Sequence, residues 1–155
     1  MRVFASSLAL VVVLGACGGA AAPAASSPTR VPTATPSPTP SPTAVVKIGD
    51  TTLGKILVDT TKGFTLYTWA KDTDENSQCS DACATAWPPL VTTATTIAGT
   101  GIKGTLGMSK RKDGAMQVTY NKHPLYFFSR DAAVGDPKGQ GSTGFGALWT
   151  VVIDP

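Results

Sequence analysis

The chain has 155 residues, with 13 Lys and Arg against 10 Asp and Glu. Arg2 and Arg30 precede the part expected to fold, which leaves 11 basic against 10 acidic residues there. A nucleic-acid-binding domain shows a clustered basic face, whereas the one short basic run, Lys110-Arg111-Lys112, fits a solvated turn beside Asp113. The length therefore allows one domain, and the near-neutral charge argues against nucleic acid as a partner.

The first 16 residues have the pattern of a secretory signal peptide, with Arg2 before a short apolar run. This run is too short to span a bilayer, which takes about 20 apolar residues. It ends in Leu14-Gly15-Ala16-Cys17, which resembles a bacterial lipobox, and the alternative is an ordinary signal with a chance cysteine. We expect Cys17 to be lipidated and to anchor an exported protein to the outer face of a bacterial membrane.

Residues 17–44 are mostly Pro, Ser, Thr and Ala, with almost no large apolar side chain. Such a segment cannot bury enough apolar surface to offset the entropy of ordering. We expect an extended, disordered stalk that holds the following domain away from the membrane.

A seven-residue pattern occurs twice, 59 residues apart, as 66–72 and 125–131. Both copies read Leu-Tyr-x-aromatic-x-basic-Asp, and each is followed by a tryptophan, Trp87 or Trp149. Alternating apolar residues predict strands before and within each copy, at 45–48, 55–58, 64–69, 106–110, 116–120 and 125–128. The sequence predicts a mostly β domain over 45–155, in which two tandem hairpin units, about 45–90 and 104–155, pack as one small sheet or sandwich. A short helical turn is expected near Cys79–Trp87.

Side chains two positions apart in a strand share a face, so Tyr67 should point with Trp69, and Tyr126 with Phe128. We expect these aromatic side chains in the core, and the alternative is a pair of ligand-binding platforms. Asp72 and Asp131 end the two strands, where a carboxylate accepts backbone N–H bonds in a turn. This capping role is favoured over catalysis.

Cys79 and Cys83 are the pair that remains once Cys17 is lipidated. In an exported domain they are expected to form a disulfide that pins the loop from Asp72 to Trp87. The alternative is redox or metal chemistry that uses both cysteines and His123. That set is one ligand short of a zinc site.

Other candidate sites are incomplete, so we predict no enzyme, no catalytic residue, no cofactor and no metal. A copper site would need Met108 and Met116, which both fit a strand pattern. Residues 72–76 begin like a calcium loop but lack its glycine and its final glutamate. The glycine-rich segments 139–141 and 144–146 lack a P-loop lysine, and His123 has no serine elbow as its partner.

Many of these features together resemble a family of predicted bacterial lipoproteins with a Tyr-x-aromatic-x-x-Asp motif, also described as a secreted repeat of unknown function. The resemblance covers about 54–153 and rests on both motif copies, the cysteine pair and Trp149, as well as on the segments 87–90, 111–114, 117–121, 135–136 and 139–141. It implies a repeat lipoprotein and carries no chemistry. We expect a binding or scaffolding module of the cell envelope that recognises an envelope protein, polymer or small ligand.

Overall fold

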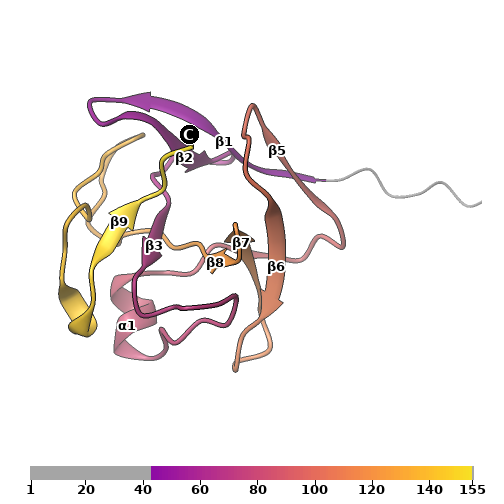
Figure 1. Cartoon of the computed structure of the whole chain (residues 1–155), viewed down its shortest axis with the longest axis vertical. Helices are drawn as coiled ribbons and strands as arrows, with labels where there is room; N and C mark the ends of the chain where they lie inside the picture. Colours follow the sequence, from indigo (N-terminus) through magenta and orange to yellow (C-terminus); the bar gives the residue numbers. More distant parts are fainter. Residues whose placement is uncertain (1–42, 155) are drawn as a thin grey trace, which may run out of the picture. The chain divides into compact units, whose positions relative to one another are not determined.

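The computed structural model describes residues 43–154 (Figure 1). The predicted signal peptide, Cys17 and residues 17–42 of the predicted stalk lie outside the described residues. Within the described part, no helix is both long and apolar enough to cross a membrane.

The first sheet has the strand order β2-β1-β5. β1 (Thr43–Thr51) and β2 (Gly54–Asp59) form an antiparallel hairpin, and β5 (Ile97–Thr100) runs parallel to β1. Gly54 has a φ of +94°, which a residue with a side chain rarely adopts, so the glycine suits this tight turn. β1 begins two residues before the strand expected from the sequence.

The second sheet contains the hairpin of β6 (Leu106–Lys110) and β7 (Met116–Tyr120). β7 also pairs with β4 (Val91–Thr92) and β8 (His123–Pro124). Both strands of the hairpin have the expected bounds, because Asp113-Gly114 supplies the turn: Gly114 has a φ of +89° and Ala115 N donates to Asp113 Oδ1 at 3.0 Å.

A third, two-stranded sheet joins the first motif copy to the C-terminal part of the chain. β3 (Tyr67–Trp69) pairs antiparallel with β9 (Trp149–Val151). The expected helical turn is present as α1 (Ala82–Ala86), and a 3-10 turn, η1 (Gly144–Gly146), precedes β9. Figure 1 shows the β1–β2 hairpin, the β6–β7 hairpin and β9 on different sides of a shared interior. The mostly β fold with two tandem repeats is therefore confirmed.

The predicted strand over 125–128 is wrong as a regular strand. The segment forms only isolated bridges, from Tyr126 to Tyr67 and to Pro89. Phe127 N donates to Pro88 O at 2.8 Å, but neither Pro88 nor Pro89 has an N–H with which to complete a ladder. The predicted strand 64–69 is likewise shorter, with β3 starting at Tyr67 and a single bridge from Thr65 to Val58.

Alternation along the motif divides the interior into two clusters. The first contains Tyr67, Trp69 and Tyr126, with Phe128 packed against it. The second contains Leu66 and Leu125, which point the opposite way. The aromatic residues of both copies therefore meet in one core, and the leucines meet in another.

Matching backbone hydrogen bonds relate the two repeats by an approximate local two-fold axis between Tyr67 and Tyr126. Each of these tyrosines donates its backbone N–H to the carbonyl oxygen of the other, at 2.9 and 3.0 Å. The surrounding backbone hydrogen bonds occur in matching pairs. Leu57 N donates to Val152 O in one repeat, as Val118 N donates to Leu90 O in the other. Likewise, Val152 N donates to Leu66 O, as Leu90 N donates to Leu125 O. Each repeat therefore completes the structure of the other.

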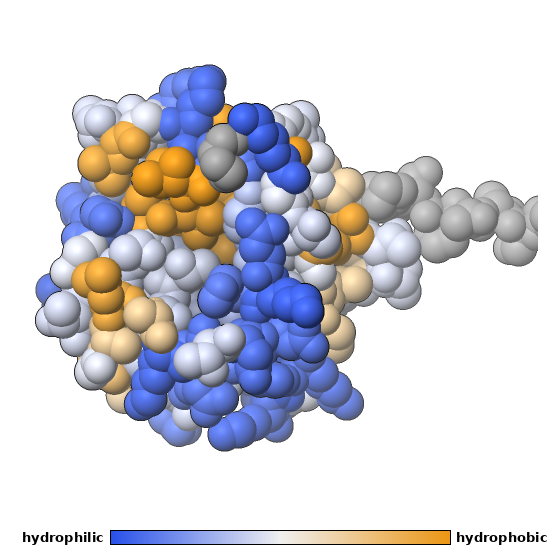
Figure 2. Space-filling view, viewed as in Figure 1, coloured by the Kyte–Doolittle hydropathy of each residue, from blue (hydrophilic) through white to orange (hydrophobic). Residues whose placement is uncertain are grey.

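The face of the molecule drawn in Figure 2 is mixed, with a hydrophobic patch beside the C-terminal end and hydrophilic residues over the opposite part. Large exposed apolar side chains include Leu53, Val134 and Ile153.

Candidate functional site

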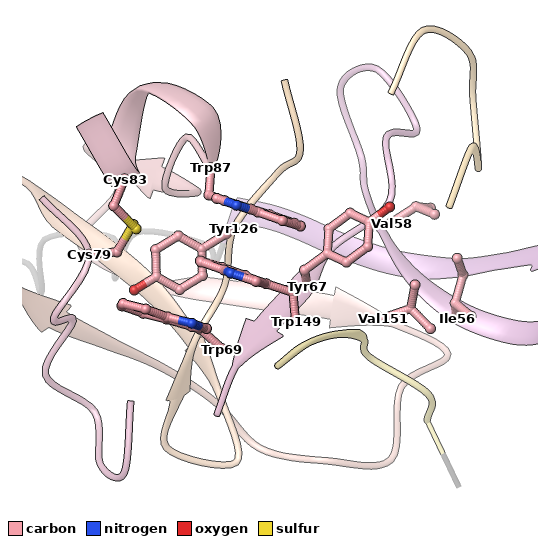
Figure 3. Close-up of a cluster of buried hydrophobic side chains, with 10 residues drawn as sticks. All are labelled: Ile56, Val58, Tyr67, Trp69, Cys79, Cys83, Trp87, Tyr126, Trp149 and Val151. Carbon is pink, nitrogen blue, oxygen red and sulfur yellow. A yellow bond between two sulfur atoms is a disulfide. The ribbon is translucent and has the colours of Figure 1, made fainter. Parts of the chain in front are cut away.

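Four aromatic rings form a continuous stack through the first cluster. Figure 3 shows the indoles of Trp69, Trp149 and Trp87 one above another. Their centroids are 5.0 Å apart for Trp69–Trp149 and 3.9 Å for Trp149–Trp87, and Phe128 continues the stack 4.3 Å from Trp87. The local axis exchanges Trp87 with Trp149 and Trp69 with Phe128. The stack is thus built symmetrically from both repeats.

Each motif tyrosine donates its hydroxyl to the aspartate of the other repeat. Tyr67 Oη donates to Asp131 Oδ2 at 2.8 Å, and Tyr126 Oη donates to Asp72 Oδ2 at 2.5 Å. The other oxygen of each carboxylate accepts a backbone N–H, from Gln78 to Asp72 at 2.7 Å and from Lys138 to Asp131 at 3.0 Å. The aspartates therefore both close a turn and join the repeats.

Burial shifts the titration of this network. Desolvation, followed by the hydrogen bond to the partner aspartate, raises the pKa of Tyr67 and of Tyr126 well above the usual range. Desolvation also raises the pKa of Asp72 and Asp131, although their hydrogen bonds to tyrosine and to backbone N–H groups act in the opposite direction. The phenols therefore stay protonated at neutral pH.

Cys79 and Cys83 form the predicted disulfide, with their Cα atoms 5.3 Å apart. Both residues are buried in the aromatic cluster (Figure 3). The nearly buried guanidinium of Arg111 donates to Cys79 O at 2.8 Å and to Ser77 Oγ at 2.9 Å, and Ser77 Oγ lies 2.6 Å from Tyr126 Oη. This arrangement fits a structural disulfide that holds the loop after Asp72 against the core.

The predicted alternative site does not assemble around the disulfide. His123 is exposed, and its Nδ1 lies 3.2 Å from the carbonyl oxygen of Asp72. Within residues 43–154, no three His, Cys, Asp or Glu side chains are grouped as metal ligands. Met108 and Met116 lie in β6 and β7, as the strand pattern predicts. In the segment considered as a calcium loop, the Asp72 carboxylate points inward, whereas Asp74 is exposed and accepts from Asn76 N.

A groove of about 430 Å³, here called the phenylalanine groove, opens beside one end of the stack. Its volume lies within the range of small-ligand sites. Its lining combines three phenylalanines with other apolar side chains and a polar rim: Phe64, Phe127, Phe128, Pro88, Leu90, Asp59, Thr61, Lys62, Ser129 and Asp131. A larger hollow of about 580 Å³ lies along Thr43–Val45, but no aromatic side chain lines it.

The local two-fold axis relates the phenylalanine groove to a second groove of about 450 Å³, here called the counterpart groove. Six of its lining residues correspond to residues that line the first: His123 to Phe64, Thr68 to Phe127, Trp69 to Phe128, Ala70 to Ser129, Asp72 to Asp131 and Thr150 to Pro88. Thr73 and Leu148 line only the counterpart groove, and Asp59, Thr61, Lys62 and Leu90 line only the phenylalanine groove. The two grooves thus share part of their lining, and three phenylalanines in one correspond to His123, Thr68 and Trp69 in the other.

Sequence reasoning singled out the motif residues but not Phe64, Phe127 or the grooves. The signal was available in the repeat itself. Aligning the copies places Phe64 opposite His123 and Phe127 opposite Thr68, the positions at which the grooves differ most in chemistry.

Comparison with known proteins supports the repeat interpretation. A family model described as a secreted repeat of unknown function matches the chain twice, at residues 47–91 and 107–153. Neither the curated proteins nor the solved structures gave a match. The two matches together cover more than half of the chain and contain both motif copies. The chain therefore belongs to this family of secreted repeats, with two copies in tandem.

Proposed function

We propose that the protein is a lipid-anchored, extracytoplasmic binding module without catalytic activity, and that its ligand occupies the phenylalanine groove. Two observations support the extracytoplasmic, lipid-anchored location: the chain belongs to a secreted family, and it contains the lipobox-like Leu14-Gly15-Ala16-Cys17. The partner in this proposal is a component of the cell envelope, not nucleic acid, because the folded part is close to neutral.

The observation that carries the binding role is the difference between the two related grooves. The framework of both is the same buried tyrosine–aspartate exchange, which needs no phenylalanine at the surface. Phe64 and Phe127 are nevertheless only partly buried, and they replace the polar His123 and Thr68 of the counterpart. Phe127 also packs against the second core cluster. Partly exposed apolar rings that line a concave surface are typical of a ligand site.

The anchor is tested by replacing the lipidated residue. Wild-type protein is expected in the membrane fraction, and Cys17→Ser is expected in the soluble extracytoplasmic fraction, because the acyl chains supply the membrane affinity. Unchanged fractionation of Cys17→Ser, with unchanged gel mobility, would show that Cys17 is not the anchor.

The groove is tested in living cells with a photo-reactive residue. The full chain carries p-benzoylphenylalanine at position 127 or, as the matched control, at the related position 68 in the counterpart groove. Irradiation is expected to yield a specific adduct from position 127 and none from position 68, with the product identified by mass spectrometry. Equal labelling from both positions, or no adduct from either, would remove the groove as the binding site.

A further inference from the structure

We propose that the phenylalanine groove recognises an organic ammonium group, held against the ring of Phe128. This inference rests on the proposed binding function and names the class of ligand. It is drawn from the counterpart groove, in which the equivalent ring already has a cation over it.

Beside the counterpart groove, the exposed Lys71 provides the internal precedent through its contact with Trp69, which lines that groove. One face of the Trp69 indole stacks on Trp149, and the Lys71 Nζ lies over the ring, 5.2 Å from its centroid. This distance is within the reach of a cation–π interaction. It is the one such contact in the described part of the chain.

The same position in the phenylalanine groove lacks an internal cation. Phe128 is the counterpart of Trp69, and it stacks on Trp87 as Trp69 stacks on Trp149. Arg130, which corresponds to Lys71, is exposed as Lys71 is, but among the described residues no cation lies over the Phe128 ring. Phe128 is partly exposed where it lines the groove, so its ring is accessible to a ligand there.

The other two rings of the groove, Phe64 and Phe127, are partly exposed. Phe64 and Phe127 line the groove with Phe128, and none of these three stacks on another of them. Three ring edges or faces around one concave space are the arrangement that recognises alkylammonium groups.

The fixed charges of the groove favour a cation. Asp59 accepts the backbone N–H groups of Thr61, Lys62 and Phe64 at 2.7–2.9 Å, which hold its carboxylate in place. Asp131 is held by Tyr67 and by a backbone N–H at the other end of the lining. The opposing charge is Lys62, whose side chain is exposed and free to extend into solvent. The lining therefore carries two held negative charges against one mobile positive charge.

The test uses choline and its neutral isostere, in which carbon replaces the ammonium nitrogen. Each is titrated into the full mature chain carrying Cys17→Ser, and the amide signals of Phe64 and Phe127 are followed by NMR. Choline is expected to bind about threefold to thirtyfold more tightly than the isostere, which is the range of a cation–π contribution.

Three variants localise the effect, and two of them, Lys62→Gln and Lys71→Gln, form a matched pair. Phe127→Thr introduces the residue that the counterpart groove carries, so the fold has a precedent for it, and this variant is expected to weaken choline binding severalfold. Lys62→Gln is expected to strengthen binding. Lys71→Gln removes the same charge beside the counterpart groove and is expected to leave the affinity of the phenylalanine groove unchanged.

The outcomes separate the ligand class from the binding site. Equal affinity for choline and the isostere would overturn the ammonium proposal, while binding that Phe127→Thr abolishes would still support the groove as a site. Absence of any choline binding, together with a specific photo-adduct from position 127, would also overturn the ammonium proposal alone. Absence of both would overturn the two proposals together.

Discussion

Tyr67 and Tyr126 form a reciprocal pair across the local two-fold axis, in which each gives its backbone N–H to the other. Beyond the backbone, each hydroxyl reaches the aspartate of the opposite repeat. The Tyr-x-aromatic-x-x-Asp spacing thus joins the two repeats. The tyrosine of each copy donates a hydrogen bond to the aspartate of the other copy.

The two tyrosine hydroxyls are expected to differ in their contribution to stability. Tyr126→Phe should lower the free energy of unfolding by about 1–3 kcal/mol, because Asp72 is 2 % exposed and loses a hydrogen bond that water cannot easily replace. Tyr67→Phe should cost less, since Asp131 is only half-buried. Urea unfolding of both variants measures the difference, and an equal or larger loss for Tyr67→Phe would contradict this explanation.

Asp72 should make stability fall with rising pH. Burial raises the pKa of this carboxyl above its ordinary value of 3.8, so the folded state retains a proton that the unfolded chain has already released. The contribution of Asp72 to the free energy of unfolding therefore begins to fall near that ordinary value, and it continues to fall as the pH rises through the higher pKa of the folded state. We expect the stability of the wild type relative to Asp72→Asn to decrease over this window, measured by urea unfolding at a series of pH values. A relative stability that increases with pH would show that the hydrogen bonds outweigh desolvation.

Removal of the disulfide should destabilise the domain modestly. Joining residues four apart closes a small ring, for which the chain-entropy contribution is about 2 kcal/mol. The double variant Cys79→Ala with Cys83→Ala should lose about that amount. In the Cys17→Ser protein, a thiol reagent should find no reactive thiol before reduction, and reduction should require denaturant because both cysteines are buried. Reactive thiols in the untreated native protein would contradict the assignment.

Gly139 should be intolerant of even one methyl group. A Cβ at this position would lie 2.7 Å from the Trp87 ring and 3.0 Å from the Tyr67 ring, and both rings are buried in the stack. We expect Gly139→Ala to cost about 1–3 kcal/mol and to change the near-ultraviolet circular dichroism of the tryptophans. Gly144→Ala is the matched control, because its Cβ would meet nothing closer than 3.4 Å. Similar melting temperatures for the two variants would contradict the steric explanation.

Much of the fold followed from local patterns in the sequence. Alternation placed Tyr67 and Leu66 on opposite faces, and the structure assigns them to separate clusters. The β6–β7 hairpin was also predictable from local sequence. Its turn needs a residue with positive φ, which Gly114 supplies next to Asp113.

The errors arose where a strand depends on its partner. The residues of 125–128 have strand character, but Pro88 and Pro89 on the neighbouring segment cannot donate the hydrogen bonds of a ladder. Pairing of this kind joins positions far apart in sequence, and alternation within one segment contains no information about it. The hydrogen bond between Tyr126 and Asp72 was not predicted for the same reason. The bond from Gln78 N to Asp72 closes a turn and joins residues close in sequence, whereas Tyr126 lies in the other repeat.

The crossed tyrosine–aspartate bonds mean that neither half of the chain has a complete interior of its own. A half-length polypeptide would need a second copy to satisfy its buried hydroxyl and carboxyl groups, so the present chain is the covalent equivalent of a symmetric dimer. Linking the halves removes the requirement that both be identical. The two grooves differ accordingly, with Phe64 and Phe127 lining one and His123 and Thr68 at the corresponding positions of the other.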